Sequence, residues 1–388
     1  MRESNNPFSP GAGTPPPELA GRAAILDRSQ TIFERTLSGF FNQGLLLIGL
    51  RGVGKTVLLG LIAQNAEALN LQLVQIEAPE GKRIAELIAP ELRRVLLKMN
   101  IGANVAEKSR RALQALKNFV GSLKISICDF EVTIEPEPGL ADSGDLDSDL
   151  TALLLAIGDA ARENKTAVVL LIDEMQYLQE VDLAALIVAM HKVAQKKLPV
   201  ILIGAGLPQL VGNAGKSKSY AERLFEYPPV GALSFEDAQA AIQKPFRAAN
   251  CELTFAAMQT LYKLTQGYPF FMQAWAYSVW NAASVCPVEE AVVLEVTNEV
   301  IQLLDRSFFR VRFDRLTPRE KDYVFSMATL GEGPHRSGDI ADSLGRTMTS
   351  LAPLRSSLIK KGMIYSPAHG DTAFTVPLFD EFLKRTMG

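Results

Sequence analysis

The 388-residue sequence is poor in both cysteine and histidine, with three of each. Cys128, Cys251 and Cys286 form no CxxC pair, and no histidine stands at the spacing of a zinc ligand. We therefore expect neither a metal cluster nor a structural disulfide framework. Isolated cysteines are also typical of a reducing compartment.

Long hydrophobic runs and a strong net charge are absent as well. No apolar run reaches the roughly 18 to 20 residues that span a bilayer, and the first residues lack the apolar core of a signal peptide. We expect a cytoplasmic protein without membrane contact. The formal charge of −3 is too small to indicate a partner, and an apolar fraction of 47% is ordinary for a globular chain.

Alternating apolar runs and helical patterns indicate an α/β domain. The strand candidates are residues 45–50, 71–78, 167–173 and 199–205. Apolar strands without alternation, separated by helices, predict a parallel sheet covered on both faces. We assign residues 18–230 to this core, with an insertion at about 100–150 whose 123–135 stretch alternates like a strand or hairpin. Residues 1–17 contain five prolines and predict a flexible tail.

The strands stop after residue 230, and two further regions follow. Residues 231–312 predict a helical lid and linker, in which the aromatic run at 269–280 is expected to be lid core rather than a ligand box. Thr317 begins a capping box with proline at the first helical position, which marks a new domain at 313–388. Its predicted order of helix, helix, helix and β-wing is that of a winged helix-turn-helix.

The strongest motif is GLRGVGKT at 49–56, which matches the P-loop pattern between a buried strand and a helix. Gly49, Gly52 and Gly54 would let backbone N–H groups surround phosphates at a helix N-terminus. Lys55 would reach the β- and γ-phosphates, and Thr56 would bind Mg²⁺. Val53 and Val57 complete the predicted nucleotide-binding set.

A second motif, VVLLIDEMQ at 168–176, ends an apolar strand in two acids. Asp173 would complete the Mg²⁺ shell with Thr56, and Glu174 would polarise an attacking water. ATP is the expected nucleotide because no NKxD guanine signature occurs. Lys55 and Glu174 are therefore the catalytic residues that these two motifs predict.

These motifs resemble the AAA+ and STAND branches of P-loop ATPases, most closely the origin-recognition-like ATPases of bacteria and archaea with a C-terminal winged helix. The resemblance covers roughly residues 19–388. It implies a Gly-Arg near the adenine pocket, here Gly21-Arg22, and a lid Gly-x-Pro, here Gly267-Tyr268-Pro269. It also implies that Arg223 acts on the γ-phosphate of a neighbouring subunit in a homo-oligomer; the alternative is a surface arginine paired with Glu222 or Glu226.

The sequence departs from that pattern in two places. The fourth strand ends in residues 204–208, GAGLP, where many AAA+ proteins have a polar sensor residue. Gln176 either supplies this polar group or is an ordinary helix-start glutamine. The lid also lacks an arginine close to Gly267, so that coupling of hydrolysis to lid motion would be weak, as in switch-type STAND proteins.

Two basic surfaces could meet duplex DNA. One covers the presumed recognition helix and preceding turn, within 346–361, and the other covers 93–124. The surface at 346–361 consists of Arg346, Thr347, Thr349, Ser350, Arg355, Ser356, Lys360 and Lys361. Protein contacts by the winged domain, and solvated helix faces at 93–124, are the alternatives. The sequence thus predicts an ATP-hydrolysing switch coupled to oligomerisation and DNA binding, or a slow-turnover signalling or scaffold module with a protein partner.

Overall fold

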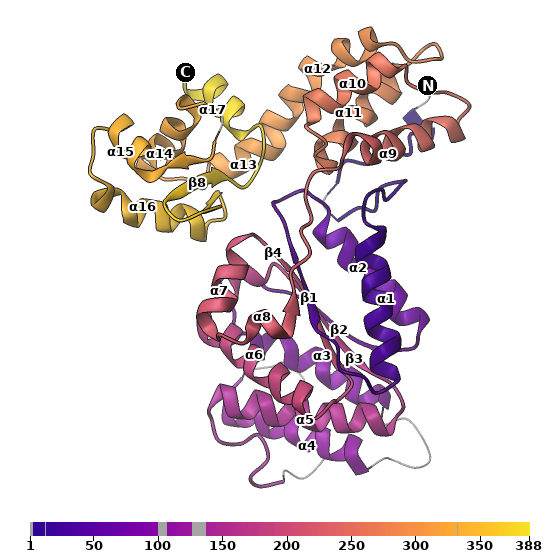
Figure 1. Cartoon of the computed structure of the whole chain (residues 1–388), viewed down its shortest axis with the longest axis vertical. Helices are drawn as coiled ribbons and strands as arrows, with labels where there is room; N and C mark the ends of the chain where they lie inside the picture. The colour runs from indigo at the N-terminus through magenta and orange to yellow at the C-terminus, as the bar shows by residue number, and fades with distance from the viewer. Residues whose placement is uncertain (1–2, 12, 100–106, 126–136, 332) are drawn as a thin grey trace. The chain divides into compact units, whose positions relative to one another are not determined.

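The computed structural model describes residues 3–11, 13–99, 107–125, 137–331 and 333–388, and the chain divides into two compact units (Figure 1). We call residues 23–48 and 58–229 the sheet unit. We call residues 1–22, 49–57 and 230–388 the lid unit.

The sheet unit is built on a parallel sheet in the order β2-β3-β4-β1-β5. Its strands are β1 (Gly44–Ile48), β2 (Gln72–Glu77), β3 (Val168–Asp173), β4 (Val200–Gly206) and β5 (Phe225–Glu226). The first four coincide with the predicted strands. The fifth, which is only two residues long and pairs Phe225 with Gly44, was not predicted.

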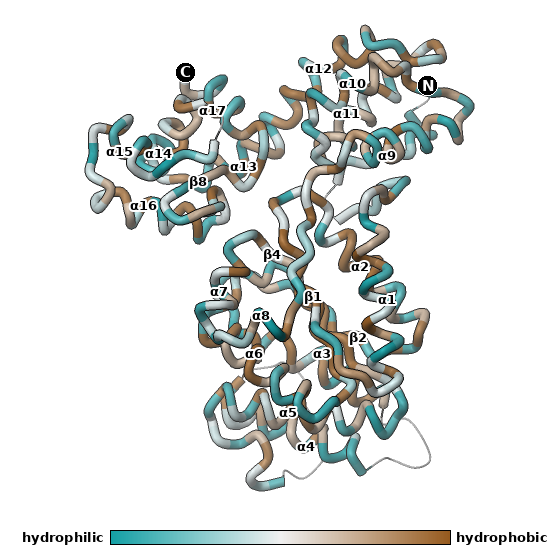
Figure 2. The backbone as a smooth tube through the Cα atoms, viewed as in Figure 1, coloured by the Kyte–Doolittle hydropathy of each residue, from teal (hydrophilic) through white to brown (hydrophobic). Residues whose placement is uncertain are grey.

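Both faces of this sheet are buried, as predicted for a parallel α/β core. Val168, Leu170 and Ile172 join one hydrophobic cluster with the flanking helices, whereas Val169 and Leu171 point to the other face and are equally buried. Figure 2 shows hydrophobic stretches in the sheet, although β2, with the sequence QLVQIE, also contains polar residues. The helices of the sheet unit include α2 (Lys55–Ala68), whose first three residues belong to the lid unit. The others are α1 (Ala23–Leu37), α3 (Ile84–Met99), α4 (Glu107–Ser122), α5 (Leu146–Glu163), the short η2 (Met175–Tyr177), α6 (Glu180–Gln195), α7 (Gln209–Ser217) and α8 (Ala221–Leu224).

The expected insertion at 100–150 contributes the helix α4. This helix packs against α3 and α5 and buries Leu113, Leu116 and Phe119 in the same hydrophobic cluster. The strand or hairpin expected at 123–135 falls mostly on residues 126–136, which lie outside the described residues.

The lid contains three helices, α9 (Phe235–Ala248), α10 (Phe255–Thr265) and α11 (Pro269–Ala282). Ser234 and Thr254 cap the first two of them by accepting a hydrogen bond from a backbone N–H three residues on. The aromatic run forms lid core as expected, since Phe271, Trp275 and Trp280 are buried. The linker follows as α12 (Glu290–Leu304), the π-helix η3 (Asp305–Phe309) and α13 (Arg310–Phe313).

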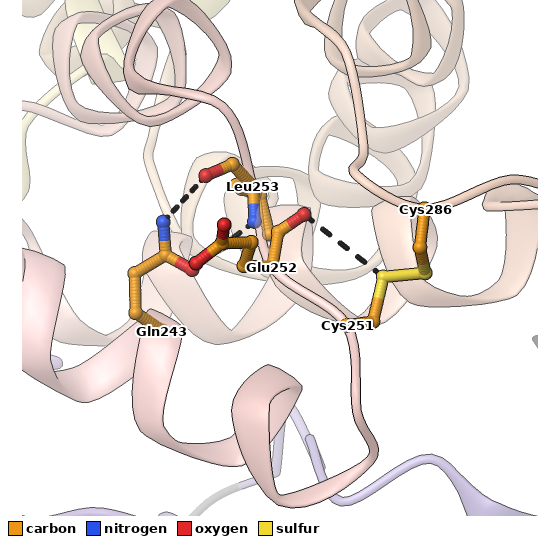
Figure 3. The surroundings of a disulfide bond; sticks show 5 residues. All are labelled: Gln243, Cys251, Glu252, Leu253 and Cys286. Carbon is orange, nitrogen blue, oxygen red and sulfur yellow. Dashed lines mark hydrogen bonds between the residues drawn. A yellow bond between two sulfur atoms is a disulfide. The ribbon is translucent and has the colours of Figure 1, made fainter.

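A disulfide between Cys251 and Cys286 corrects the expectation of isolated cysteines (Figure 3). The segments after α9 and α11 run side by side, with Leu253 bridged to Val288, which brings the two Cα atoms to 5.5 Å. Thirty-five positions separate the cysteines, so no local spacing reveals the pairing. The argument for a reducing compartment from unpaired thiols therefore no longer holds.

The N-terminal segment also differs from the flexible tail expected for residues 1–17. Phe8 is only 1% exposed and packs on Phe246 and Trp280, with ring centroids 5.5 and 6.1 Å away. Asn6 Nδ2 donates to the Tyr277 carbonyl at 3.0 Å. One aromatic side chain and one amide thus anchor a proline-rich segment, whose short helix is η1 (Glu3–Asn5), to the lid.

The C-terminal region has the predicted order of three helices and a hairpin. It comprises α14 (Pro318–Thr329), β6 (His335–Arg336), α15 (Ser337–Ser343), α16 (Met348–Lys360), β7 (Ile364–Tyr365), β8 (Asp371–Phe374) and α17 (Phe379–Met387). Thr317 and Glu320 form the expected capping box. The strand β6, which adds to the hairpin beside β8, and the final helix α17 were not predicted. Across the described ranges, none of the helices combines the length and apolar character needed to cross a bilayer.

Candidate nucleotide site

The P-loop has the backbone that a phosphate cradle requires. Gly52 and Gly54 have φ angles of +80° and +91°, a region open to glycine, and α2 begins directly afterwards at Lys55. Apart from its chain neighbours, no atom of the described residues lies within 4 Å of the position that a Cβ on Gly54 would take. An anion can therefore approach these amides closely at the positive end of a helix dipole.

The side chains of the motif are arranged around this loop. Lys55 is 6% exposed, and its Nζ donates to the carbonyls of Gly49 and Leu50 at 2.9 and 2.7 Å. Thr56 is exposed at the next position. Val53 is buried and Val57 half-buried. The lysine is thus already folded back over the loop whose phosphates it would bind.

Gly49 occupies a crowded position at the start of the motif. A Cβ added there would lie 2.0 Å from the Val230 carbonyl oxygen and 2.9 Å from Val53 Cγ2. The sequence therefore needs glycine at this position for packing as well as for phosphate access.

Arg22, predicted near the adenine pocket, lies against the P-loop. Its guanidinium donates to the Val53 carbonyl at 3.4 Å and to the Gly231 carbonyl. Burial lowers the pKa of Arg22, and the nearby Asp237 carboxylate opposes that shift. The side chain of Arg22 thus ties the P-loop to the segment that enters the lid, and Gly21 precedes it with a positive φ.

The lid Gly-x-Pro motif also contacts the P-loop. Pro269 is the first residue of α11, and the N–H of Phe270 after it donates to the Gly52 carbonyl at 3.2 Å. Tyr268, between Gly267 and Pro269, is 2% exposed, and its hydroxyl has no hydrogen-bond partner in the described part of the chain. Burial raises the pKa of Tyr268. Sequence reasoning did not select this tyrosine, although its place inside the motif was a usable signal.

These observations fit a nucleotide with its phosphates on the P-loop. The Cβ position of Gly54 is uncrowded, the ammonium of Lys55 is held by the Leu50 carbonyl of the same loop, and the buried Tyr268 hydroxyl has no partner among the described residues. A buried hydroxyl without a partner is costly, and a polar ligand can supply one. The residues present therefore suit ATP, and Thr56 is exposed at the start of α2.

The acidic pair lies in the sheet unit at the end of β3. Asp173 is the last residue of the strand, and its Oδ1 accepts from the Glu174 N–H at 2.8 Å. Glu174 adopts a left-handed conformation, with φ of 53°. Gln176 Nε2 donates to Glu174 Oε2, and Gln176 Oε1 accepts from the Leu207 N–H at 3.0 Å. Along the chain, Gly49 directly follows β1.

Arg223 lies in the short helix α8 and is exposed. Among the described residues its guanidinium has no ion-pair partner, and Glu226 instead accepts from Arg28 Nε at 3.0 Å. The backbone of Arg223 accepts from Gln43 Nε2 at 3.1 Å. This position is at the amino end of β1, whereas the P-loop follows its carboxyl end.

The predicted DNA surfaces are partly used within the protein. Arg355 donates to Thr372 Oγ1 at 3.0 Å and to the Asp371 carbonyl at 2.9 Å, and Lys361 donates to Glu320 Oε2 at 2.7 Å. The exposed members of the recognition-helix set are Arg346, Thr347, Thr349, Ser350, Ser356 and Lys360.

Within 93–124, Arg94 and Arg111 have acidic partners. Arg94 pairs with Glu91 at 2.8 Å, and Arg111 pairs with Glu137 at 3.5 Å. Such pairs lower the positive charge available to a polyanion.

Comparison with known proteins assigns the N-terminal part of the chain. Residues 18–203 match the AAA ATPase domain family. This domain contains both the P-loop and the acidic pair, and its match confirms the predicted P-loop ATPase resemblance. Residues 306–383 match a domain of unknown function, DUF8462. A search of curated proteins found none that matches the chain.

The chain is also similar to several solved structures. The Walker-type ATPase PABY2304 of Pyrococcus abyssi aligns with a TM-score of 0.54 at 18% identity, covering 94% of this chain and 96% of that one. The RuvB Holliday junction branch migration motor of Thermotoga maritima aligns at 0.44 and 15%, covering 94% and 95%. The Aeropyrum pernix ORC1 protein, solved in complex with DNA, aligns at 0.45 and 15%, covering 95% and 93%.

Proposed function

We propose that this protein binds ATP with Mg²⁺ on residues 49–57 and hydrolyses it to ADP and phosphate. The P-loop carries the proposal, because its positive-φ glycines, its buried lysine and the start of α2 form an anion site without rearrangement of the backbone. The AAA ATPase domain match over the same residues supports it.

The chain's side chains have distinct tasks in this reaction. Lys55 would leave the Gly49 and Leu50 carbonyls to neutralise β- and γ-phosphate oxygens. Thr56 and Asp173 would hold Mg²⁺, which supplies positive charge to the phosphates when bound. Glu174 would accept a hydrogen bond from the attacking water and take its proton. The bond from the γ-phosphorus to the bridging oxygen breaks, and ADP leaves with the electron pair.

Residues of the lid unit beside the P-loop would make further contacts with the nucleotide. Arg22 and the Gly267-Tyr268-Pro269 motif lie against the P-loop, so a base and ribose would meet these residues. The Tyr268 hydroxyl would gain its missing partner from the nucleotide or its water.

We further propose that nucleotide state controls assembly and DNA binding. Arg223 is exposed without an ion-pair partner in the described chain, which suits a group that completes a neighbouring subunit's site in a homo-oligomer. The C-terminal region, with its three helices and hairpin, would act as a winged helix-turn-helix that presents Arg346, Thr349 and Lys360 to duplex DNA.

A second function is favoured by one observation. Arg355 and Lys361 are engaged inside the C-terminal region, which leaves fewer cations for phosphate contacts. A slow-turnover nucleotide-dependent module that uses this region to bind a protein would need no such charge.

Titration calorimetry with ATP and Mg²⁺, combined with phosphate-release measurements, tests the main proposal. Lys55→Ala should abolish binding, and Glu174→Gln should retain binding but lose turnover. Lys263→Ala, an exposed lysine on α10, is the matched control. Wild-type protein that is folded but has no affinity for ATP would refute the proposal.

A further inference from the structure

The carboxyl end of β4 has no polar side chain of its own, because neighbouring side chains fill the space. A Cβ on Gly204 would lie 2.0 Å from Met175 Sδ, closer than any real contact. A Cβ on Gly206 would lie 3.0 Å from Gln176 Oε1 and 2.7 Å from Leu210 Cδ2. The two glycines therefore make room for the turn that follows β3.

Gln176 occupies that space with both ends of its carboxamide bonded. Its Oε1 accepts from the Leu207 N–H at 3.0 Å, at the point where β4 has just ended. Its Nε2 donates to Glu174 Oε2. A single planar amide thus joins the carboxylate at the end of β3 to the backbone at the end of β4, the adjacent strand in the sheet.

Glu174 needs such a support because its backbone is in an uncommon conformation. A φ of 53° is costly for a residue with a side chain, and such conformations persist when the surroundings hold them. The hydrogen bonds of Glu174 N–H to Asp173 and of its carboxylate to Gln176 fix the residue at both the main chain and the side chain.

We propose that Gln176 is a positioning residue for hydrolysis: it holds the Glu174 carboxylate at a fixed place relative to the end of β4, from where Glu174 orients the attacking water. This inference rests on the proposed ATPase function. It assigns to Gln176 the polar group that the end of β4 lacks, supplied from the neighbouring turn. The amide acts through Glu174 and does not itself contact the nucleotide.

The chemistry of the carboxamide makes the role specific. Leucine fills a similar volume but can neither donate nor accept. Glutamate keeps the length, but its carboxylate has no hydrogen to donate and would repel Glu174. Asparagine is one methylene shorter and cannot reach both partners with the same geometry. Misplacing a general base by about 1 Å can cost on the order of 100-fold in rate.

Single-turnover hydrolysis and ATP affinity of Gln176→Leu provide the test. We expect the rate of the chemical step to fall by about 30- to 100-fold, with the Kd for ATP and Mg²⁺ changed by less than about threefold. Gln179→Leu is the matched control, since Gln179 is exposed three positions on and makes no capping hydrogen bond with its side chain. A Gln176→Leu variant that retains the wild-type rate would overturn the positioning role.

A double-mutant cycle distinguishes positioning from a general structural effect. If Gln176 acts through Glu174, Gln176→Leu should cause no further loss in a Glu174→Gln background. Independent, multiplying losses would overturn the inference. Hydrogen exchange at the Leu207 amide should also become faster in Gln176→Leu, because that N–H loses its acceptor.

Three further outcomes have distinct meanings. If Gln176→Leu does not fold, Gln176→Glu retains the shape of the side chain and should show the same selective loss of rate. If the wild-type protein neither binds nor hydrolyses ATP, the proposed function itself fails. If both Gln176 variants hydrolyse ATP at the wild-type rate, the positioning role is refuted and the proposed ATPase function is not.

Discussion

Lys361 Nζ lies 2.7 Å from Glu320 Oε2 and joins the last turn of α16 to the first turn of α14. The same carboxylate accepts from Ser357 Oγ at 2.7 Å and from the Thr317 N–H at 2.8 Å. Glu320 is therefore a buried carboxylate with its hydrogen bonds satisfied, and the Lys361 ammonium has partners within the C-terminal region.

The pH dependence of unfolding should report this carboxylate. Burial acts to raise the pKa of Glu320, but the hydrogen bonds from Lys361, Ser357 and Thr317 prevail and lower it to about 2, from 4.5 in the absence of these contacts. A depressed folded-state pKa gives stability that is full above pH 4.5 and is lost as the pH falls toward 2.

We therefore expect Glu320→Gln to lower the free energy of unfolding by about 2 kcal/mol at pH 7. The difference from wild type should shrink steadily below pH 4.5. Urea unfolding at pH 7 and pH 3 measures both values. Glu381→Gln, on the exposed surface of α17, is the control. Equal differences at the two pH values would contradict this explanation.

Removing the Cys251–Cys286 disulfide should destabilise the lid. The bond closes a loop of 35 positions, for which chain entropy predicts about 3 to 4 kcal/mol. Thermal unfolding of Cys251→Ser with Cys286→Ser, compared with wild type in the presence and absence of reductant, measures the loss. If the reductant shifts the melting temperature of the double variant as much as that of wild type, the shift does not come from this bond.

The backbone of Gly52 should be essential for nucleotide binding. Alanine at a φ of +80° costs about 1 to 2 kcal/mol, and its Cβ would lie 3.1 Å from Tyr268 Cε1. We expect Gly52→Ala to weaken ATP binding at least 10-fold in titration calorimetry. Gly60→Ala, in the interior of α2 with open space around the added methyl group, should bind normally and fold slightly more stably.

Arg223 should affect the rate of ATP hydrolysis only when subunits associate. We expect the wild-type rate per subunit to rise with protein concentration and Arg223→Ala to remove that rise while ATP affinity stays within about twofold. Arg28→Ala, which breaks the partly exposed pair with Glu226 in the same unit, is the control and should retain the rise. A wild-type rate that is independent of concentration would count against action in trans.

The helix α16 and the turn before it give a paired prediction for DNA. Arg346→Ala and Lys360→Ala should weaken duplex binding and reduce its salt dependence without lowering the melting temperature, because both side chains are exposed. Arg355→Ala should lower the melting temperature, because that guanidinium holds Thr372 and the Asp371 carbonyl of the hairpin. No duplex binding by wild type at low salt would favour the protein-binding alternative.

The sequence predicted those elements whose signal is local. The four long strands follow from uninterrupted apolar runs, the capped helices from Ser234, Thr254 and Thr317, and the P-loop from its glycine spacing. Each of these features depends on a few residues close together in the chain.

What the sequence did not reveal depends on residues distant in the chain. The two-residue strand β5 exists because Phe225 pairs with Gly44, and Cys251 meets Cys286 only after the lid has folded. The sequence left two interpretations of Gln176, a substitute polar group or an ordinary helix-start glutamine. Only the structure shows that its side chain accepts a hydrogen bond from the Leu207 N–H. Arg355 and Lys361 were grouped with surface cations because their internal acceptors lie in other elements.

The burial of Phe8 has a practical consequence for producing shortened or tagged versions of the protein. A version that begins at residue 18 would leave Phe246 and Trp280 without the Phe8 ring, and the loss of a buried phenylalanine typically costs about 3 to 5 kcal/mol. Purification tags at this end need a spacer long enough to leave the aromatic anchor seated. A protein trimmed to residue 18 should be more prone to aggregate, for a reason unrelated to nucleotide chemistry.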